Sequence, residues 1–280
     1  MGIESQLDFL VESKGRHSIV PCSVQPAGTM GYFRPVYWLL LTQRYGLWRG
    51  FWLYLQFKWL ERTTLQLPAL ERPIAFREGM SERHAFAQVF IHREYDFNWD
   101  GDLRRIVDVG ANVGLATLYF QQQCPEAVIA AVEPHPGNAE AFRGNTAHLD
   151  GVELFEAALH NRSGETLAVT DEGFGSNGFM TRSEGGDQCV AKVPSISIPD
   201  IMTRMGWTDI DLVKVDIEGG EGALFEAHCD WMDVTRHIVL EFHERMVPGS
   251  SVSALKAMTA KGFRVADVRG ENVLFSRPMD

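Results

Sequence analysis

The segment Asp108-Val-Gly-Ala-Asn-Val-Gly114 constrains the fold of this 280-residue chain more than any other feature. The apolar run Arg105–Val109 leads into it, and a helical pattern follows over 115–123. A short apolar run that ends at glycines is typical of a buried parallel strand. Gly110 permits a tight turn and Gly114 permits a close approach of the backbone. The segment therefore predicts a strand, a glycine loop and a helix in direct succession.

The rest of the C-terminal part alternates between strand and helix patterns. We expect strands at 128–132, 152–158, 166–170, 212–217 and 237–242, and helices at 139–149, 201–205 and 252–261. Two last apolar runs, 263–268 and 272–275, flank Arg-Gly-Glu and predict an antiparallel hairpin. The alternation predicts an α/β fold. Helices on both faces would make the sheet doubly wound, and the C-terminal hairpin is the part that separates sheets that bind S-adenosylmethionine (SAM) from plain dinucleotide-binding sheets.

The pattern divides the chain near residue 62. Residues 1–62 are rich in aromatic side chains and predict a mainly helical cap that contacts substrate or a second subunit in a homodimer. Residues 63–280 predict the sheet domain. Within it, 63–100 form a lead-in, with a hairpin followed by a helix that Ser81 caps.

The aromatic segment 36–60 holds four of the seven tryptophans. Arg44, Arg49 and Lys58 interrupt it, so it falls short of the roughly 20 apolar residues that a membrane-spanning helix needs. Two interpretations stay open. The aromatic side chains form the core of the cap, or they make a peripheral contact with a membrane surface.

Charge and cysteine content narrow the classes of function. The net charge of -11 argues against nucleic acid as the main partner, because phosphates require a cationic surface. The four cysteines lie far apart without a CxxC pair, so we expect neither a zinc site nor a disulfide framework. A reduced, cytoplasmic compartment fits this pattern. The polar start after Met1 predicts no secretory signal.

An acidic residue, Glu133, follows the second strand about 20 residues after the glycine loop. A carboxylate at this place accepts hydrogen bonds from two ribose hydroxyls, in NAD sites and in SAM sites alike. It therefore predicts an adenosine site without fixing the reaction. In a SAM site, Asp108 is expected near the methionine amino group. Thr117 and the free N–H groups of the following helix are expected near the carboxylate. The alternatives are an ordinary strand-to-helix turn and a solvated strand-end acid.

Two further strand ends carry candidate catalytic residues. Asp216 and Glu218 follow the apolar run at 212–217, at the edge of the sheet where ligands bind. His243 follows the next strand and has an ordinary pKa that suits a general base. In the structural alternative, Lys214 pairs with a neighbouring acid. A divalent metal ranks second to these roles, and we assign no metal ligands. The glycine-rich segment 172–178 is interpreted as a lid or as a simple loop.

Residues 74–245 resemble the FkbM-type methyltransferases. The resemblance rests on the order and spacing of four motifs: Arg77-Glu-Gly-Met-Ser81-Glu82 with Phe86, Val89-Phe90 and Glu94-Tyr95; Asp108 to Gly114; Glu133-Pro-His-Pro136-Gly-Asn138; and Lys214-Val-Asp216-Ile-Glu218-Gly-Gly-Glu221. The family often has Ser-Asp where this chain has Ser81-Glu82. The resemblance implies the class I methyltransferase fold, a Rossmann-like, doubly wound, seven-stranded sheet with a C-terminal antiparallel hairpin, and SAM as cofactor. The residues expected to bind it are Asp108, Gly110, Asn112, Gly114, Thr117, Glu133, Pro134, Ala158, Tyr95 and Ser81.

The resemblance also implies methyl transfer to an oxygen. We expect a hydroxyl of a sugar, glycan or natural-product-type small molecule to attack the methyl group directly. Asp216, Glu218 and His243 would orient this hydroxyl or remove its proton. One rival function is an NAD-dependent oxidoreductase, which shares the loop and the acid, although GANVG lacks the GxGxxG spacing. The other is a non-catalytic adaptor that binds a membrane surface through the tryptophan-rich segment.

Overall fold

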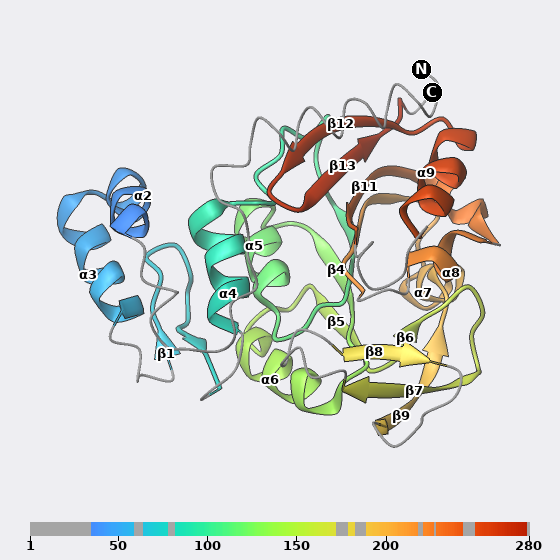
Figure 1. Ribbon diagram of the computed structural model, residues 1–280, viewed down its shortest axis with the longest axis horizontal. Coiled ribbons are helices and arrows are strands. Elements are labelled where there is room, and N and C mark those ends of the chain that lie inside the picture. Colours follow the sequence, from blue (N-terminus) through green and yellow to red (C-terminus); the bar gives the residue numbers. More distant parts are fainter. Residues whose placement is uncertain are drawn as a thin grey trace.

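The computed structural model describes residues 35–58, 64–77, 82–171, 179–182, 189–217, 221–226, 228–242 and 250–278. Its centre is a seven-stranded sheet with the order β12-β13-β11-β10-β3-β4-β5 (Figure 1). The five consecutive strands β11, β10, β3, β4 and β5 run parallel, and β13 is antiparallel to both of its neighbours. This order confirms the predicted class I fold with its terminal hairpin. The strands are β3 Arg105–Val109, β4 Val128–Val132, β5 Val152–Phe155, β10 Ile210–Val215, β11 Thr235–Glu241, β12 Arg264–Arg269 and β13 Asn272–Ser276.

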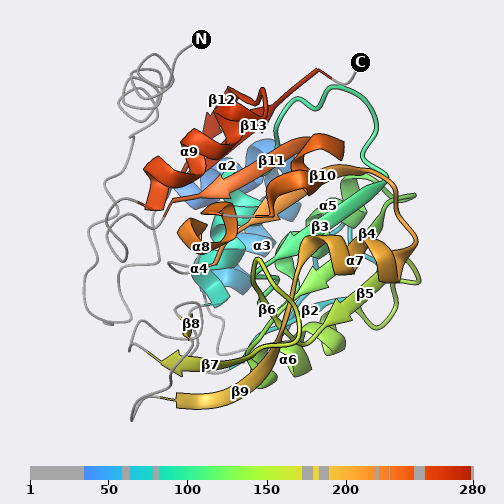
Figure 2. The same cartoon turned by 90° about the vertical axis from the view of Figure 1, so that its right-hand side faces the viewer.

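Helices cover both faces of this sheet (Figure 2). Side chains of successive strand residues point to opposite faces, so Ile106 packs with the α5 side and Val107 with the α7 side. The first face carries α5 Leu115–Gln123 and α6 Pro136–Thr146. The second face carries α7 Ile198–Met205, α8 Glu221–Glu226, the 3₁₀ helix η2 Cys229–Val234 and α9 Ser250–Ala260. The structure thus confirms a doubly wound arrangement.

A second, four-stranded sheet has the order β6-β9-β7-β8. Its strands are β6 Ala158–Leu159, β7 Thr166–Asp171, β8 Phe179–Arg182 and β9 Cys189–Ile196. The expectation of one strand over 152–158 was therefore wrong. The N–H of Ala157 donates to the carbonyl of Phe155 at 2.9 Å, and Glu156 between them is exposed. This three-residue turn redirects the chain, so Ala158 pairs with Ser195 in the second sheet.

The lead-in has the predicted hairpin, with β1 Thr64–Leu65 antiparallel to β2 Ile74–Ala75. The predicted helix is present as α4 Glu82–Phe86, which continues into the π-helix η1 Ala87–His92. Before the lead-in, α2 Pro35–Tyr45 and α3 Leu47–Lys58 form a two-helix unit, here called the α2–α3 hairpin. It contributes Tyr37, Leu41, Leu53 and Phe57 to the core that also covers α5, so part of the cap is packed on the sheet domain.

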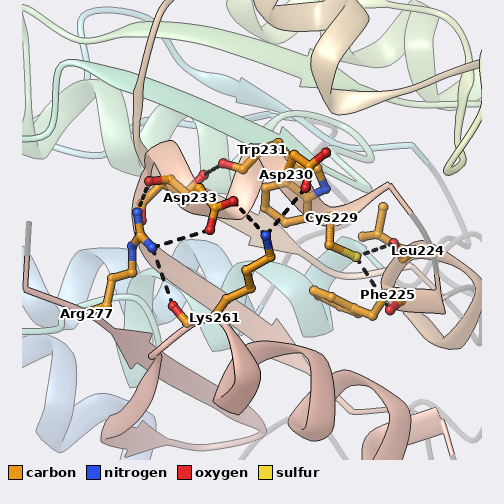
Figure 3. Close-up of polar contacts among 9 residues, drawn as sticks. Leu224, Phe225, Cys229, Asp230, Trp231, Asp233, Lys261 and Arg277 are labelled. Atoms are coloured by element: carbon orange, nitrogen blue, oxygen red, sulfur yellow. Dashed lines mark hydrogen bonds and ion pairs between the residues drawn. The ribbon is translucent and has the colours of Figure 1, made fainter.

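Two basic side chains fasten the end of the chain to η2 (Figure 3). Lys261 Nζ lies 2.6 Å from Asp233 Oδ2 and 3.5 Å from Asp230 Oδ1. Arg277, just after β13, places Nη1 3.8 Å from Asp233 Oδ1 and donates from Nε to the carbonyl of Thr235 at 3.1 Å. These contacts hold the terminal hairpin against the second helical face. Among the described helices, none is long and apolar enough to cross a membrane.

Candidate active site

The glycine loop after β3 lies across the ends of its neighbouring strands. Gly110 has φ +70° and Gly114 has φ +89°, values that favour glycine. A Cβ atom on Gly110 would collide with the backbone carbonyl of Asp216, so no other residue fits there. The N–H groups of Gly110 and Ala111 both donate to the carbonyl of Val132 at 3.0 Å. The loop is therefore fixed against β4 on one side and the end of β10 on the other.

The N-terminus of α5 opens directly from this loop. Gly114 occupies the N-cap position, and no side chain caps the helix. The first bond of the helix ladder runs from the N–H of Leu118 to the carbonyl of Gly114. The N–H groups of a first helical turn have no partner within the helix and carry its positive dipole end. This end of α5 is suited to an anionic group such as a carboxylate.

Glu133 places its carboxylate beside the loop, immediately after β4. Its oxygens accept hydrogen bonds from the backbone N–H groups of Asn112 and His135, both at 2.8 Å. A third bond, at 3.3 Å, comes from Asn138 Nδ2 in the first turn of α6. Burial raises the pKa of Glu133 to about 7, although these donors and the positive charge of Lys214 act in the opposite direction. The carboxylate is thus oriented before any ligand arrives.

The lead-in supports Glu133 indirectly, through Asn138. Arg77 donates from Nη2 to Asn138 Oδ1 at 2.8 Å, and its guanidinium forms an ion pair with the buried Glu82. The backbone N–H of Arg77 also donates to Glu82 at 2.7 Å. We did not predict Arg77, Glu82 or Asn138 as site residues, although all three belong to the motifs quoted for the resemblance. These contacts join the first motif, around Arg77 and Glu82, to the third, around Glu133 and Asn138.

A buried lysine links β10 to β3. Lys214 Nζ lies 3.2 Å from Asp108 Oδ1 and 3.5 Å from Asp216 Oδ2, and it donates to the carbonyl of Gly110 at 3.0 Å. Burial by itself lowers the pKa of Lys214, but the two carboxylates raise it above its ordinary value. The structural alternative, an ion pair of Lys214 with neighbouring acids, is therefore present. The sequence indicated this ion pair because Lys214 is a charged residue within an otherwise apolar strand, where it needs a partner.

Asp108 and Thr117 are bonded to each other inside the protein. The Thr117 hydroxyl donates to Asp108 Oδ2 at 2.6 Å, and both residues are fully buried. Lys214 lies against the other oxygen, Oδ1, of the same carboxylate. Asp108 thus links Lys214 on β10 to Thr117 on α5 beneath the glycine loop. A direct contact of Asp108 or Thr117 with a cofactor stays a prediction.

A second group of acids lies on the other side of Asp216. Glu94 is buried below the β12–β13 turn, where a Cβ on Gly270 would collide with its carboxyl group. Asn272 Nδ2 donates to Glu94 Oε2 at 3.2 Å. Burial, with the negative charges of Glu271 and Asp216, raises the pKa of Glu94 to about 7. Glu94 was quoted in a motif but was not among the expected site residues.

Tyr95 shares this region. It is buried beside Phe120, with ring centroids 5.4 Å apart. Burial raises the pKa of its hydroxyl well above the ordinary value, and the negative charges of Asp216 and Glu241 act in the same direction. Asp216, with a side chain that is 30% exposed, is therefore shared between the Lys214 ion pair and this acidic region.

The other expected site residues have different outcomes. Ser81, Glu218, His243 and the segment 172–178 lie outside the described residues. Pro134 is half-buried next to Glu133, whereas Ala158 lies on β6 and packs with Leu167, Val169 and Val193. Within the described ranges, His, Cys, Asp and Glu side chains form no group that could hold a metal ion.

The strand order with its antiparallel terminal hairpin defines a Rossmann-like fold of the class I methyltransferase type. The family model described as the methyltransferase FkbM domain matches residues 108–265, which is more than half of the chain. The chain therefore belongs to the FkbM methyltransferase family and is a methyltransferase. This confirms the resemblance seen in the motifs and favours the enzyme over the adaptor and the oxidoreductase.

Three relatives show the same class of protein. Methyltransferase 1 of Beauveria bassiana is 26% identical, over 64% of this chain and 80% of the relative. Methyltransferase sdnD of Sordaria araneosa is 29% identical, over 59% and 76%. The 2-O-methyltransferase NoeI of Sinorhizobium fredii is 25% identical, over 61% and 75%.

Proposed function

We propose that this enzyme transfers a methyl group from SAM to a hydroxyl of a sugar, a glycan or a natural-product-type small molecule. The observation that carries the proposal is the Glu133 carboxylate, which is buried and oriented beside a glycine loop and an uncapped helix N-terminus. Oxygen as the acceptor atom is supported by the similar 2-O-methyltransferase NoeI.

The residues present fit the chemical groups of SAM. The Glu133 carboxylate is an acceptor for the two ribose hydroxyls, and the N-terminus of α5 is a donor for the methionine carboxylate. The backbone at Gly110, Asn112 and Gly114 would line the cofactor between these two points. Asp108 would act near the amino group and Thr117 near the carboxylate. Tyr95, Pro134, Ala158 and Ser81 complete the proposed binding set.

The acidic region would receive the acceptor. When bound, SAM supplies a methyl group on a positively charged sulfur, which a hydroxyl oxygen attacks in line. Asp216 is the described residue placed to orient that hydroxyl, because it lies at the end of β10 and is partly exposed. Glu218 and His243 follow β10 and β11 in the sequence and are proposed to orient it or remove its proton. Positioning of the two reactants would supply most of the rate enhancement.

Calorimetry with SAM, S-adenosylhomocysteine and NAD tests the cofactor. We expect micromolar SAM binding and no NAD binding. The substitution Glu133→Gln should weaken SAM binding at least tenfold, because a carboxylate acceptor is lost. Glu153→Gln, on the exposed surface of β5, is the matched control and should have no effect. Binding of NAD without SAM would overturn the proposal.

Turnover with a methyl acceptor found by screening tests the acceptor side. Asp216→Asn and His243→Ala should each lower kcat more than they change the affinity for SAM. The assignment of these residues fails if both variants keep the full turnover of the parent enzyme.

A further inference from the structure

The α2–α3 hairpin has two apolar sides, and only one of them packs on the protein. Tyr37, Leu41, Leu53 and Phe57 are buried in the core. The ring of Phe57 lies 5.4 Å from that of Phe86, which anchors α3 to the lead-in. The opposite side is exposed and is called here the aromatic face. It consists of Val36, Trp38, Leu39, Leu47, Trp48, Phe51 and Trp52.

This face concentrates most of the exposed apolar surface of the described residues. Beyond its seven members, only Val128, Val190 and Val252 are large, apolar and exposed there. Trp48 is 75% exposed and Trp52 is 61% exposed. Residues three and four apart lie on one side of a helix, so Trp48, Phe51 and Trp52 form a continuous surface on α3. Such a contiguous patch marks an interaction site.

The charge of the hairpin is opposite to that of the whole chain. Residues 35–58 contain Arg44, Arg49 and Lys58 but no Asp or Glu, whereas the net charge of the chain is -11. Arg49 is exposed next to Trp48. A two-fold dimer through this face would bring the cations of both copies together, which disfavours a second copy as the partner. An anionic surface is the complementary partner.

Tryptophan combined with arginine and lysine fits the headgroup layer of a lipid bilayer. Indole rings prefer the membrane interface, and each cation near an anionic surface adds to the attraction. The helices have 11 and 12 residues, so each is about 18 Å long at most, well below the hydrocarbon thickness of about 30 Å. They are suited to lie in the interface and not to cross it.

The hairpin is also in a position to reach a flat surface. Figure 1 shows α2 and α3 at one extremity of the described fold, beyond α4 and α5, with β7, β8 and β9 on the other side. We propose that the α2–α3 hairpin docks this methyltransferase on an anionic lipid surface. Trp48 and Trp52 insert into the headgroup layer, and Arg49 contacts lipid phosphates.

Flotation of the full chain with lipid vesicles tests the proposal. One set of vesicles is phosphatidylcholine alone, and the other contains about one third phosphatidylglycerol, which supplies the anionic headgroups. We expect binding to the anionic set that weakens at high salt. The double substitution Trp48→Gln and Trp52→Gln should reduce partitioning at least tenfold. Arg49→Gln should reduce it about fivefold on anionic vesicles only.

Matched controls remove similar side chains elsewhere. The pair Val190→Gln and Val252→Gln removes exposed apolar groups from β9 and α9, and Arg204→Gln removes an exposed cation from α7. Both should change partitioning less than twofold. Circular dichroism confirms folding of each variant, and Trp48→Gln alone, at the most exposed tryptophan, replaces the double variant if that variant unfolds.

Three results would overturn the proposal. The first is equal binding of the parent protein to both kinds of vesicle, and the second is unchanged binding of the tryptophan variants. The third is a dimer, detected by light scattering without vesicle binding, that the tryptophan substitutions dissociate. In that case a second copy of the chain covers the aromatic face.

Discussion

Two buried glutamates on either side of Asp216 share a pKa of about 7 but have opposite surroundings. Glu133 meets three N–H donors and the charge of Lys214, so everything near it except burial favours the carboxylate. Glu94 also accepts hydrogen bonds, from Asn272 and from the backbone of Glu271, but the negative charges of Glu271 and Asp216 favour the protonated acid together with burial. The same pKa thus arises at a site prepared for a negative charge and at a site that resists one.

The difference suggests different tasks in catalysis. Additional donors from a ligand would favour the ionised form of Glu133 further, because its own donors already lower its pKa against the effect of burial. Glu94 would hold its proton below about pH 7 and would there limit the negative charge of the acidic region. Lys214 belongs to both regions, because it lowers the pKa of Glu133 and pairs with the Asp216 that raises the pKa of Glu94.

Removal of Lys214 should have the largest effect. In Lys214→Met the buried Asp108 loses its positive partner, and the free energy of unfolding should fall by about 3–5 kcal/mol. Urea denaturation at pH 7 measures the change, with Lys192→Met on the exposed side of β9 as control. A loss below about 1 kcal/mol would show that the ion pair is not what holds the two regions together.

Glu94→Gln should stabilise the protein at alkaline pH. The pKa of Glu94 in the fold is about 7, against an ordinary value of 4.5 for this carboxyl group, so the folded state holds the extra proton between these two pH values. Stability from this group is therefore full below about pH 4.5 and is lost as the pH rises through 7. We expect a gain of about 1–3 kcal/mol at pH 8 and almost none at pH 4.5.

Urea denaturation at both pH values checks this expectation. Glu126→Gln is the control, because Glu126 is exposed and far from the acidic region in the sequence. A gain of equal size at both pH values would mean that the burial of the charge is not the cause.

The regions around Glu133 and Glu94 also differ in how far the sequence predicts them. The parallel strands were predictable because their apolar runs end at the glycine loop, at Glu133 and at Asp216. The turn at Glu156 was not, because its single Ala157-to-Phe155 hydrogen bond has no periodic signal and yet moves Ala158 into another sheet. Glu133 was found because its spacing from the loop is a local feature.

The surroundings of Glu94 could not be predicted in this way, because they are formed by residues that are distant in the sequence. Glu94 and Asn272 are separated by 178 positions, and their approach depends on how the lead-in meets the terminal hairpin. Lys214 did carry a signal, as a charged residue within an apolar strand, but its partners Asp108 and Asp216 follow only from the register of β10 with β3.

The pH dependence of SAM binding sharpens the comparison. Ribose hydroxyls that donate to Glu133 require the carboxylate form, whose population rises as the pH passes 7. Affinity should therefore increase about tenfold between pH 6 and 8, with release of a proton on binding. Calorimetry in buffers of different ionisation enthalpy measures that proton. Glu133→Gln should lose the dependence and Glu94→Gln should keep it; the reverse result would exchange the roles of the two glutamates.

Asn138→Ala should have the smallest effect and the most specific one. The variant removes a weak donor to Glu133 and the acceptor for Arg77, so SAM affinity at pH 8 should fall about threefold. Because that donor favours the carboxylate, its loss should also raise the pKa of Glu133 and move the midpoint of the pH dependence upward. Calorimetry over a pH series measures both quantities.

Asn145→Ala is the matched control on the same helix. Asn145 is buried in α6 like Asn138, but it bonds Ala75 and Val113 and not Glu133. It should lower stability and leave the midpoint in place, because it removes structural bonds without changing the donors around the carboxylate. If both variants shift the midpoint equally, the placement of α6 as a whole controls Glu133. If only Asn138→Ala shifts it, the individual donors explain why Glu133 and Glu94 differ.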